Sequence, residues 1–203
     1  MPELPEVETV RKQLEKEILG SEIVGIEVRD SHCWVGPTSS LHGGTPLGVK
    51  REKIVGVERT GKYLFVKFGS GRGLQIHLKM TGRLVLNEPF YETAIHTRVV
   101  VELGDGRKIY YWDTRMFGYI QLVEQIEVQH QKIRGKVGPE PWDMSDTDLL
   151  RKLQKTGRAI KEAILDQSLL AGMGNIYAND GLWLAGIDPR RKANTLKLSE
   201  VKK

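Results

Sequence analysis

Apolar side chains recur every three or four positions at the start of the chain. Val7, Val10, Leu14 and Ile18 follow this spacing, and a glycine comes two positions after the last of them. Because an α-helix completes a turn in about 3.6 residues, this spacing places the four side chains on one face. A glycine just after the last apolar position is a common helix end. The pattern therefore predicts an amphipathic helix over residues 3–19.

From residue 21 to about residue 123 the pattern changes to short runs that are rich in β-branched and aromatic residues. Glycine-containing turn signals such as Gly61 and Gly104-Asp105-Gly106 separate these runs. Short strands at this spacing are typical of an antiparallel sandwich or barrel. The predicted strands cover residues 23–26, 54–57, 63–66, 74–78, 99–101 and 108–112.

A polar, proline-containing segment separates this part from a second one. Gly138-Pro139-Glu140-Pro141 cannot continue a helix or a strand, because proline fixes φ and lacks the N–H group. Ser145, with Asp148 three residues later, then has the pattern of a helix N-cap. Helical periodicity follows over residues 159–166 and 175–185, with a two-glycine turn between them. The predicted class is α+β, with an antiparallel β domain at residues 1–123, a linker at 124–144 and a helical domain at 145–203.

Composition narrows the class of protein. The chain has 203 residues, and 39% of them are hydrophobic, so it can bury a sizeable core. No apolar run approaches the ~20 residues that span a bilayer, and the first residues are charged, unlike a signal peptide. We therefore expect a cytoplasmic protein with no membrane partner. Cys33 is the single cysteine, which excludes an internal disulfide and a multi-cysteine zinc site and favours a small buried side chain.

The charge is compatible with a polyanionic partner. The formal net charge is +5, although many proteins with this charge bind nothing acidic. Basic residues gather in three places, and each such cluster taken alone is most often a solvated face. The clusters are Arg51, Lys53, Arg59 and Lys62; Lys152, Lys155, Arg158 and Lys161; and Arg190, Arg191 and Lys192.

The first residues after Met1 include a candidate nucleophile. If Met1 is removed, Pro2 becomes a secondary amine between acidic neighbours, and an α-amino group has a pKa of roughly 7.7–8. Such an amine can attack an aldehyde-level carbon to give an iminium while Glu3 moves protons. Proline and acids are also ordinary residues at the start of a helix. The terminus alone therefore favours structural capping.

Four separated motifs favour the chemical interpretation. They are residues 1–9 (MPELPEVET), 77–82 (HLKMTG), 113–118 (DTRMFG) and 172–177 (GMGNIY). In order and spacing through nearly the whole chain, they resemble the formamidopyrimidine-DNA glycosylase family. This resemblance implies that residues 1–123 form an antiparallel β-sandwich with an N-terminal helix, and that residues 145–203 form a helix–two-turn–helix domain that is incomplete at its C-terminus.

The resemblance also implies a bifunctional base-excision repair enzyme. It would remove oxidised purines (formamidopyrimidines and 8-oxoguanine) from double-stranded DNA as a glycosylase and then act as an abasic-site lyase. Pro2 would attack C1′ of the nucleoside as the base leaves, and Glu3 would handle protons at the deoxyribose. The iminium acidifies the C2′ proton, so β- and δ-elimination cut the strand. Glu6 would hold the helix and the sugar, and Lys62 would touch the phosphate or sugar from a hairpin tip.

Further residues would contact DNA. An enzyme that acts on a stacked base must extrude it and fill the gap, and Met80, Arg115 and Phe117 match the family's side chains for this task. His77 and His96 match histidines that lie near the DNA backbone. The contacts expected in the helical domain are Lys155, Arg158, Lys161, Gly174 and Asn175.

The turn before Asn175 has a physical argument of its own. A helix that begins near Asn175 presents unpaired N–H groups, and Gly172 and Gly174 would let a phosphate approach the backbone. Asn175 would cap this helix and donate to the same phosphate. Without the resemblance, an ordinary N-cap after a glycine turn is the stronger interpretation.

The chemistry implied requires neither a metal nor a cofactor. The sequence departs from the family pattern at its far end, because it stops at Lys203 before the rest of the helical domain, the loop around the flipped purine and the β-hairpin zinc finger. The family's structural zinc site is therefore absent from this sequence, and we expect the affinity for DNA to be weaker than the family's. We also expect the protein to be a monomer. Two alternatives stay open: a non-catalytic damaged-DNA-binding fragment of the same family, and an inert fragment that a partner completes.

Overall fold

The computed structural model describes residues 2–37 and 51–203. The chain divides into two compact units, Met1–Gln131 and Lys132–Lys203, which are described separately below. Within the described residues, no helix combines the length and the apolar character that crossing a bilayer would need.

The first unit begins with helix α1 (Leu4–Ile18), which covers the range that the apolar spacing predicts. Proline in its first turn needs no N–H partner there, and Glu6 Oε2 accepts a hydrogen bond of 2.8 Å from the backbone N–H of Glu3. Val7, Leu14 and Ile18 of the apolar stripe are buried, Val10 is partly buried, and the helix packs against strands β3 and β4. The sequence pattern thus fixes both the length of this helix and the face that it buries.

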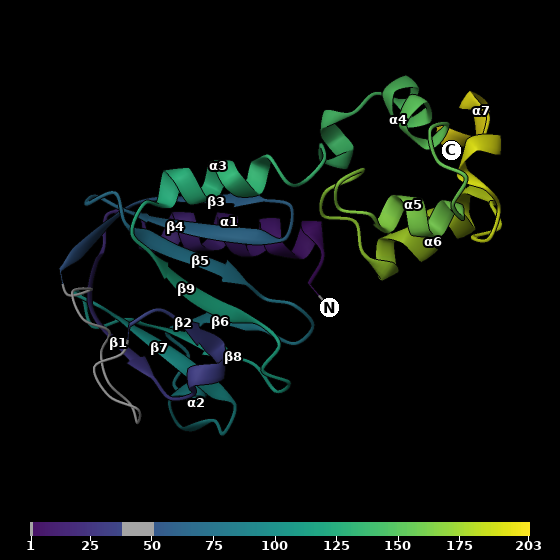
Figure 1. The fold of residues 1–203 in the computed structure, drawn as a ribbon. Coiled ribbons are helices and arrows are strands. Elements are labelled where there is room, and N and C mark those ends of the chain that lie inside the picture. The colour runs from purple at the N-terminus through teal and green to yellow at the C-terminus, as the bar shows by residue number, and fades with distance from the viewer. Residues whose placement is uncertain (1, 38–50) are drawn as a thin grey trace. The chain divides into compact units, whose positions relative to one another are not determined.

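The described part of the unit contains a single sheet of nine strands, shown in Figure 1. The neighbours are antiparallel except for the short parallel pair β2–β9. The order across the sheet is β2-β9-β5-β4-β3-β1-β7-β8-β6. The strands are β1 (Glu22–Val28), β2 (Trp34–Val35), β3 (Glu52–Thr60), β4 (Tyr63–Phe68), β5 (Gly73–His77), β6 (Arg83–Leu86), β7 (Thr97–Leu103), β8 (Lys108–Trp112) and β9 (Tyr119–Val123).

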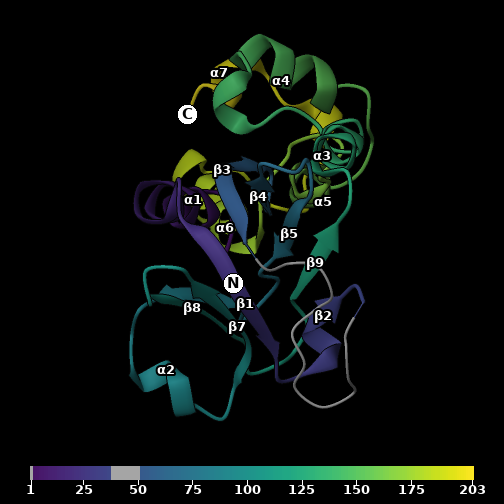
Figure 2. The same ribbon diagram turned by 90° about the vertical axis from the view of Figure 1, so that its left-hand side faces the viewer.

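Strand β1 connects the two halves of this sheet. Its first residues, Glu22 and Ile23, pair with β3, and the rest of the strand pairs with β7, so the chain passes from one layer to the other along β1 (Figure 2). Side chains from both halves and from α1 form one core cluster. Ile54 and Ile76 from one half line the same small apolar cavity as Val101 and Ile109 from the other. The sheet therefore closes over its own core, as expected of a sandwich.

Residues 124–144, expected to be a linker, contain the helix α3 (Ile126–Arg134) and a short 3₁₀ turn at Pro141–Asp143. Ile126, His130 and Ile133 are buried at spacings of four and three. His130 stacks on Phe65 with 4.2 Å between the ring centroids, and its Nε2 lies 2.7 Å from Thr60 Oγ1. This sparse stripe, set among polar residues, explains why the helix is hard to see in the sequence. A shorter helix, α2 (Phe90–Thr93), precedes β7.

The second unit is helical. Its helices are α4 (Asp146–Leu153), α5 (Ile160–Leu165), α6 (Asn175–Ala185) and α7 (Leu198–Val201). Ser145 caps α4, because its side chain accepts a hydrogen bond of 3.1 Å from the backbone N–H of Asp148, as predicted. Helix α6 ends at Gly186 in the left-handed conformation. Its N-cap is Gly174, which corrects the expectation for Asn175: the asparagine is the first helical residue and does not cap the helix.

Candidate functional site

The candidate site of the first unit starts at the N-terminus of α1. Pro2 is partly exposed, whereas the Glu3 side chain is fully buried. Because the Glu6 carboxylate accepts the Glu3 N–H, Glu6 holds the backbone of the first turn in place. Of the two tasks expected for Glu6, holding the helix and holding the sugar, this hydrogen bond concerns the helix alone. Once Met1 is removed, the partly exposed nitrogen of Pro2 is a secondary amine next to the buried Glu3 carboxylate, an arrangement that suits nucleophilic attack with proton transfer.

Lys62 lies in the two-residue turn between β3 and β4, as expected of a hairpin tip. Thr60 pairs with Tyr63 across the turn, and Gly61 has a φ of 56°, which glycine adopts readily. Burial lowers the pKa of Lys62, the negative charge of Glu3 opposes this shift, and the positive charge of Lys79 adds to it. The start of α1 and this turn therefore belong to one electrostatic cluster.

His77 lies at the end of β5 in the same cluster. It pairs with Tyr63 in the sheet, and its Nδ1 accepts a hydrogen bond of 3.0 Å from the backbone N–H of Lys79. Burial, together with the positive charges of Lys79 and Lys62, lowers the pKa of His77 to about 3. The ring is neutral at physiological pH, so His77 can meet a phosphate only as a neutral Nε2 donor and not as a cation.

Two loops beside this cluster are joined through one buried carboxylate. Asp113 is fully buried, and the hydroxyl of Thr81 donates to its Oδ1. The backbone N–H of Arg115 donates to Oδ1 at 3.1 Å, and that of Gly118 donates to Oδ2 at 3.0 Å. Burial alone would raise the pKa of Asp113, but these hydrogen bonds hold it below its usual value. The sequence places Asp113 in a motif but gives no sign of this task, since its partner Thr81 is 32 positions away.

Large side chains project from these two loops into solvent. Met80 is 41% exposed on the first loop, and Phe117 is 53% exposed on the second. The Arg115 guanidinium lies over the Phe117 ring, 4.6 Å from its centroid. Exposed apolar side chains on a rigid base are a poor choice for stability but suit insertion into a ligand. Arg115 and Phe117 thus contact each other, and Met80 lies on the loop that Asp113 joins to theirs through Thr81.

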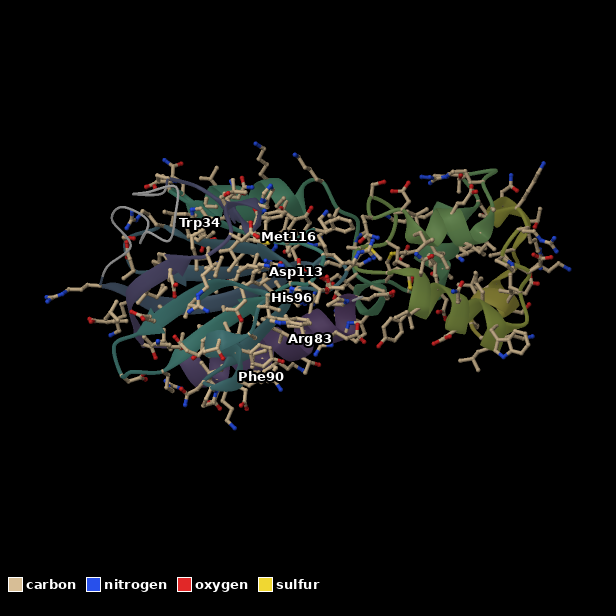
Figure 3. All side chains as sticks on the ribbon, turned by 90° about the horizontal axis from the view of Figure 1, so that it is seen from below. Trp34, Arg83, Phe90, His96, Asp113 and Met116 are labelled. Carbon is tan, nitrogen blue, oxygen red and sulfur yellow. The ribbon has the colours of Figure 1, made fainter. Side chains whose placement is uncertain are left out.

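His96 joins this group through its backbone. Its carbonyl accepts a hydrogen bond of 3.0 Å from the Asp113 N–H, and the two residues lie side by side in Figure 3. The ring packs edge-on against Trp112, and its Nδ1 lies 3.2 Å from an Arg98 nitrogen. Arg83, which the sequence did not single out, lies over the same Trp112 ring at 5.4 Å.

The site residues expected in the second unit fall at the ends of its helices. Lys155 and Arg158 are exposed in the segment between α4 and α5, and Arg158 is paired at 2.8 Å with Asp166. Lys161 is half-buried in the first turn of α5. Gly174 is buried as the N-cap of α6, and Asn175 is exposed beside it.

The described residues contain no cluster of side chains typical of a metal site. Among them, no three His, Cys, Asp or Glu side chains gather closely enough to hold an ion. Cys33 is buried, and burial raises the pKa of its thiol to about 12, so it acts as the small apolar side chain that the sequence predicts.

Two family models match the chain. The model of the formamidopyrimidine-DNA glycosylase N-terminal domain matches residues 1–120, and the model of the formamidopyrimidine-DNA glycosylase H2TH domain matches residues 137–203. The formamidopyrimidine-DNA glycosylase of Desulfitobacterium hafniense is 42% identical over 206 residues, which cover 100% of this chain and 74% of the relative. That of Ligilactobacillus salivarius is 40% identical over 206 residues, which cover 100% of this chain and 72% of the relative.

Solved structures agree with these matches. A crystal structure of the Lactococcus lactis formamidopyrimidine-DNA glycosylase, bound non-covalently to DNA with an abasic site, is 34% identical with a TM-score of 0.85 and covers 98% of this chain and 76% of its own. A complex of the Lactococcus lactis protein with DNA that contains FAPY-dG has a TM-score of 0.86 at 34% identity and covers 98% and 74%. The matches confirm the predicted fold, a β-rich unit with an initial helix followed by a helical unit.

Proposed function

The chain belongs to the formamidopyrimidine-DNA glycosylase family, and from this premise we propose that it removes oxidised purines from DNA and then cuts the strand at the abasic site. The observation that carries the proposal is the cluster of Pro2, Glu3 and Lys62. A partly exposed proline and a buried carboxylate lie at the start of α1, and the half-buried ammonium of Lys62, whose pKa is lowered by burial, interacts electrostatically with that carboxylate. These are the groups that imine chemistry at a sugar carbon needs.

The reaction starts once Met1 has been removed and Pro2 carries a free secondary amine. Its nitrogen forms a bond to C1′ of the damaged nucleoside, and the N-glycosidic bond to the oxidised base breaks. Glu3 moves protons at the deoxyribose, whose ring opens to give an iminium. Loss of the acidified C2′ proton expels the 3′ phosphate, and a second elimination expels the 5′ phosphate. Water then releases the sugar remnant from Pro2, which restores the amine.

Lys62 and the paired loops prepare the substrate for this reaction. Lys62 contacts the phosphate or sugar of the damaged nucleotide, and its partial burial strengthens that contact because water screens it less. Met80, Arg115 and Phe117 occupy the gap that an extruded base leaves and face the orphaned base. His77 and His96 lie near the DNA backbone. Similar Lactococcus lactis structures contain DNA with an abasic site or FAPY-dG, which supports duplex DNA as the partner.

The second unit supplies phosphate contacts by the same proposal. The backbone N–H groups at the start of α6, next to Gly174 and Asn175, carry partial positive charge and suit an anion. Lys155, Arg158 and Lys161 add positive charge, so binding should weaken steeply as salt rises.

Borohydride trapping tests this function. Mass spectrometry first verifies the proline terminus, and the protein is then reduced with borohydride on an abasic duplex. A covalent adduct is expected, and Pro2→Gly should reduce it strongly. Pro5→Ala is the matched control, because it changes a proline of the same helix start but leaves the terminal amine intact. Trapping on a panel of lesion duplexes then identifies the preferred base.

If a chain with a verified proline terminus gives no adduct, the proposed enzymatic activity is wrong. Salt-sensitive binding of the abasic duplex without trapping would instead support a non-catalytic damaged-DNA binder of the same family. These two outcomes separate chemistry from recognition, because recognition does not require the amine of Pro2.

A further inference from the structure

An arginine outside the reacting cluster connects the two elements that form it. Arg59 is the next-to-last residue of β3, and only 7% of its side chain is exposed. Its Nε donates a hydrogen bond of 2.8 Å to Glu8 Oε2 on α1, and its Nη1 donates one of 2.9 Å to the carbonyl of Gly61. One planar guanidinium therefore holds a side chain on α1 and the backbone of the turn that carries Lys62.

Both contacts act directly on the geometry of the cluster. The carbonyl of Gly61 belongs to the peptide unit that joins Gly61 to Lys62, so a hydrogen bond to it fixes the plane from which Lys62 starts. Glu8 lies five residues after Glu3 on one rigid helix, a rise of about 7.5 Å. Arg59 therefore sets the position of the Lys62 backbone relative to the helix that begins at Glu3.

The partner carboxylate is itself held firmly. Arg11, on the same helix, donates to Glu8 through its Nε at 3.0 Å and its Nη2 at 3.0 Å. Burial would raise the pKa of Glu8, but the hydrogen bonds and charges of Arg11 and Arg59 keep it below its usual value. Glu8 is therefore ionised at neutral pH, and its bond to Arg59 is charge-assisted.

Stability alone is a weak reason for such a pair. Removing two charges from water offsets much of their attraction, and apolar replacements of buried pairs are often neutral or stabilising. What the pair provides is a directed geometry, because an apolar contact would allow the turn to slide over the helix. The Arg59–Glu8 pair joins α1 to the turn that follows β3. Glu3, at the start of α1, and Lys62, in that turn, interact electrostatically across the same junction.

We propose that Arg59 is a positioning residue of the lyase site, which acts through Glu8 and the Gly61 carbonyl to hold Lys62 against the start of α1. This inference rests on the proposed function, since it assigns Lys62 a task in the reaction. Arg59 needs no contact with the substrate for this role.

The test uses Arg59→Lys, which keeps the charge but replaces the planar fork, whose Nε and Nη1 reach Glu8 and Gly61, with a single ammonium. Arg72→Lys is the matched control: Arg72 is 20% exposed and pairs through its Nε at 3.0 Å with Glu52, at the opposite end of β3. In single-turnover borohydride trapping, Arg59→Lys should slow adduct formation about tenfold or more, and Arg72→Lys should change it less than about twofold. On a Lys62→Ala background, Arg59→Lys should cause less than about a twofold further loss.

A second readout does not depend on activity. Lysines labelled at Cε allow the titration of Lys62 to be followed by NMR. Arg59→Lys should move the midpoint for Lys62 upward by about half a pH unit or more, because a displaced side chain regains water. Arg72→Lys should leave the midpoint unchanged. Glu8→Gln, which removes the partner charge, should slow trapping in the same way and serves if Arg59→Lys does not fold.

The outcomes separate the two proposals. If the wild-type chain traps and Lys62→Ala is impaired but Arg59→Lys is not, the positioning role is wrong and the enzyme stands. The positioning role would also be wrong if Arg59→Lys slowed adduct formation by the same factor in the wild-type chain and in the Lys62→Ala variant. If the wild-type chain gives no adduct, the proposed function fails, and an unmoved Lys62 titration in Arg59→Lys would reject the positioning role separately.

Discussion

The buried carboxylate of Asp113 accepts a hydrogen bond of 3.0 Å from the backbone N–H of Gly118. The same carboxylate accepts from Thr81 on the neighbouring loop, so one side chain fixes the base from which Met80 and Phe117 project. Exposed apolar side chains are otherwise free to fold back onto the protein surface. A buried acceptor for several donors prevents this, because releasing the loops would leave the carboxylate without its partners.

We expect Asp113→Asn to lower both stability and DNA binding. The amide has one acceptor oxygen and presents N–H groups where Arg115 or Gly118 also donates, so at least one buried donor loses its partner. The free energy of unfolding should fall by about 1–3 kcal/mol. Urea unfolding measures the stability, and titration of an abasic duplex measures the affinity. Asp105→Asn, at an exposed carboxylate of the same unit, should leave both the stability and the affinity nearly unchanged.

A methyl group at Gly118 should also disturb this base. A Cβ there would lie 2.1 Å from Tyr111 Oη and 2.7 Å from the carbonyl of His77, and neither can retreat without moving the sheet. Gly118→Ala should therefore destabilise the protein by about 1–3 kcal/mol, the usual range for overpacking. Gly181→Ala is the control, because its Cβ would meet nothing within 4 Å on helix α6. It should be neutral or stabilising by up to about 1 kcal/mol, and equal losses in the two variants would contradict this account.

The buried ring of His77 should make stability depend on acid pH. In the unfolded chain a histidine binds a proton below roughly pH 6.5, whereas the folded protein resists protonation until the pKa of about 3. Between these values the unfolded state binds more protons, so stability is lost as the pH falls. The slope can reach about 1.4 kcal/mol per pH unit.

His77→Asn keeps an acceptor for the Lys79 N–H but does not titrate. Urea unfolding at several pH values between 7 and 4 should therefore give a shallower loss of stability for His77→Asn than for wild type. A wild-type slope in His77→Asn would mean that other groups cause the acid sensitivity.

Phe117→Ala should separate binding from folding. The ring is 53% exposed and touches the Arg115 guanidinium, so its loss should change the free energy of unfolding by less than about 1 kcal/mol. Affinity for an abasic duplex should fall about tenfold, since the gap in the base stack is no longer filled. Phe90→Ala, at a more exposed ring of the same unit, should bind as wild type does. If both variants bind normally, Phe117 does not enter the DNA.

The elements that the sequence predicts well are those with local causes. The apolar stripe that ends at Ile18 sets the length of α1. Ser145 caps α4 through a hydrogen bond to the N–H of Asp148, three residues later, and Gly186 ends α6 in a conformation that glycine favours. Each signal lies within a few residues of the feature that it controls. The turn that carries Lys62 can likewise be predicted from the sequence, because it contains Gly61.

The features that the sequence does not reveal depend on distant partners. Helix α3 has only a few buried positions, and His130 is buried because Phe65 and Thr60 meet it from the sheet. Strand β2 is two residues long and exists through its pairing with β9. The task of Asp113 likewise needs Thr81. Such residues look like ordinary polar positions until the tertiary structure places them together.

Asn175→Asp should move stability and DNA binding in opposite directions. Asn175 is the first residue of α6 and is exposed, so a carboxylate there interacts favourably with the positive end of the helix dipole. The free energy of unfolding should rise by about 0.3–1 kcal/mol.

The same charge occupies the proposed phosphate site, so the affinity of Asn175→Asp for an abasic duplex should fall several-fold. The salt dependence of binding should decrease by about one phosphate contact. Asn194→Asp adds the same charge at an exposed position outside α6 and should leave the stability nearly unchanged, with a smaller loss of affinity. Since stability and affinity change with opposite signs, a damaged fold cannot imitate the result, and unchanged affinity in Asn175→Asp would exclude a phosphate at the start of α6.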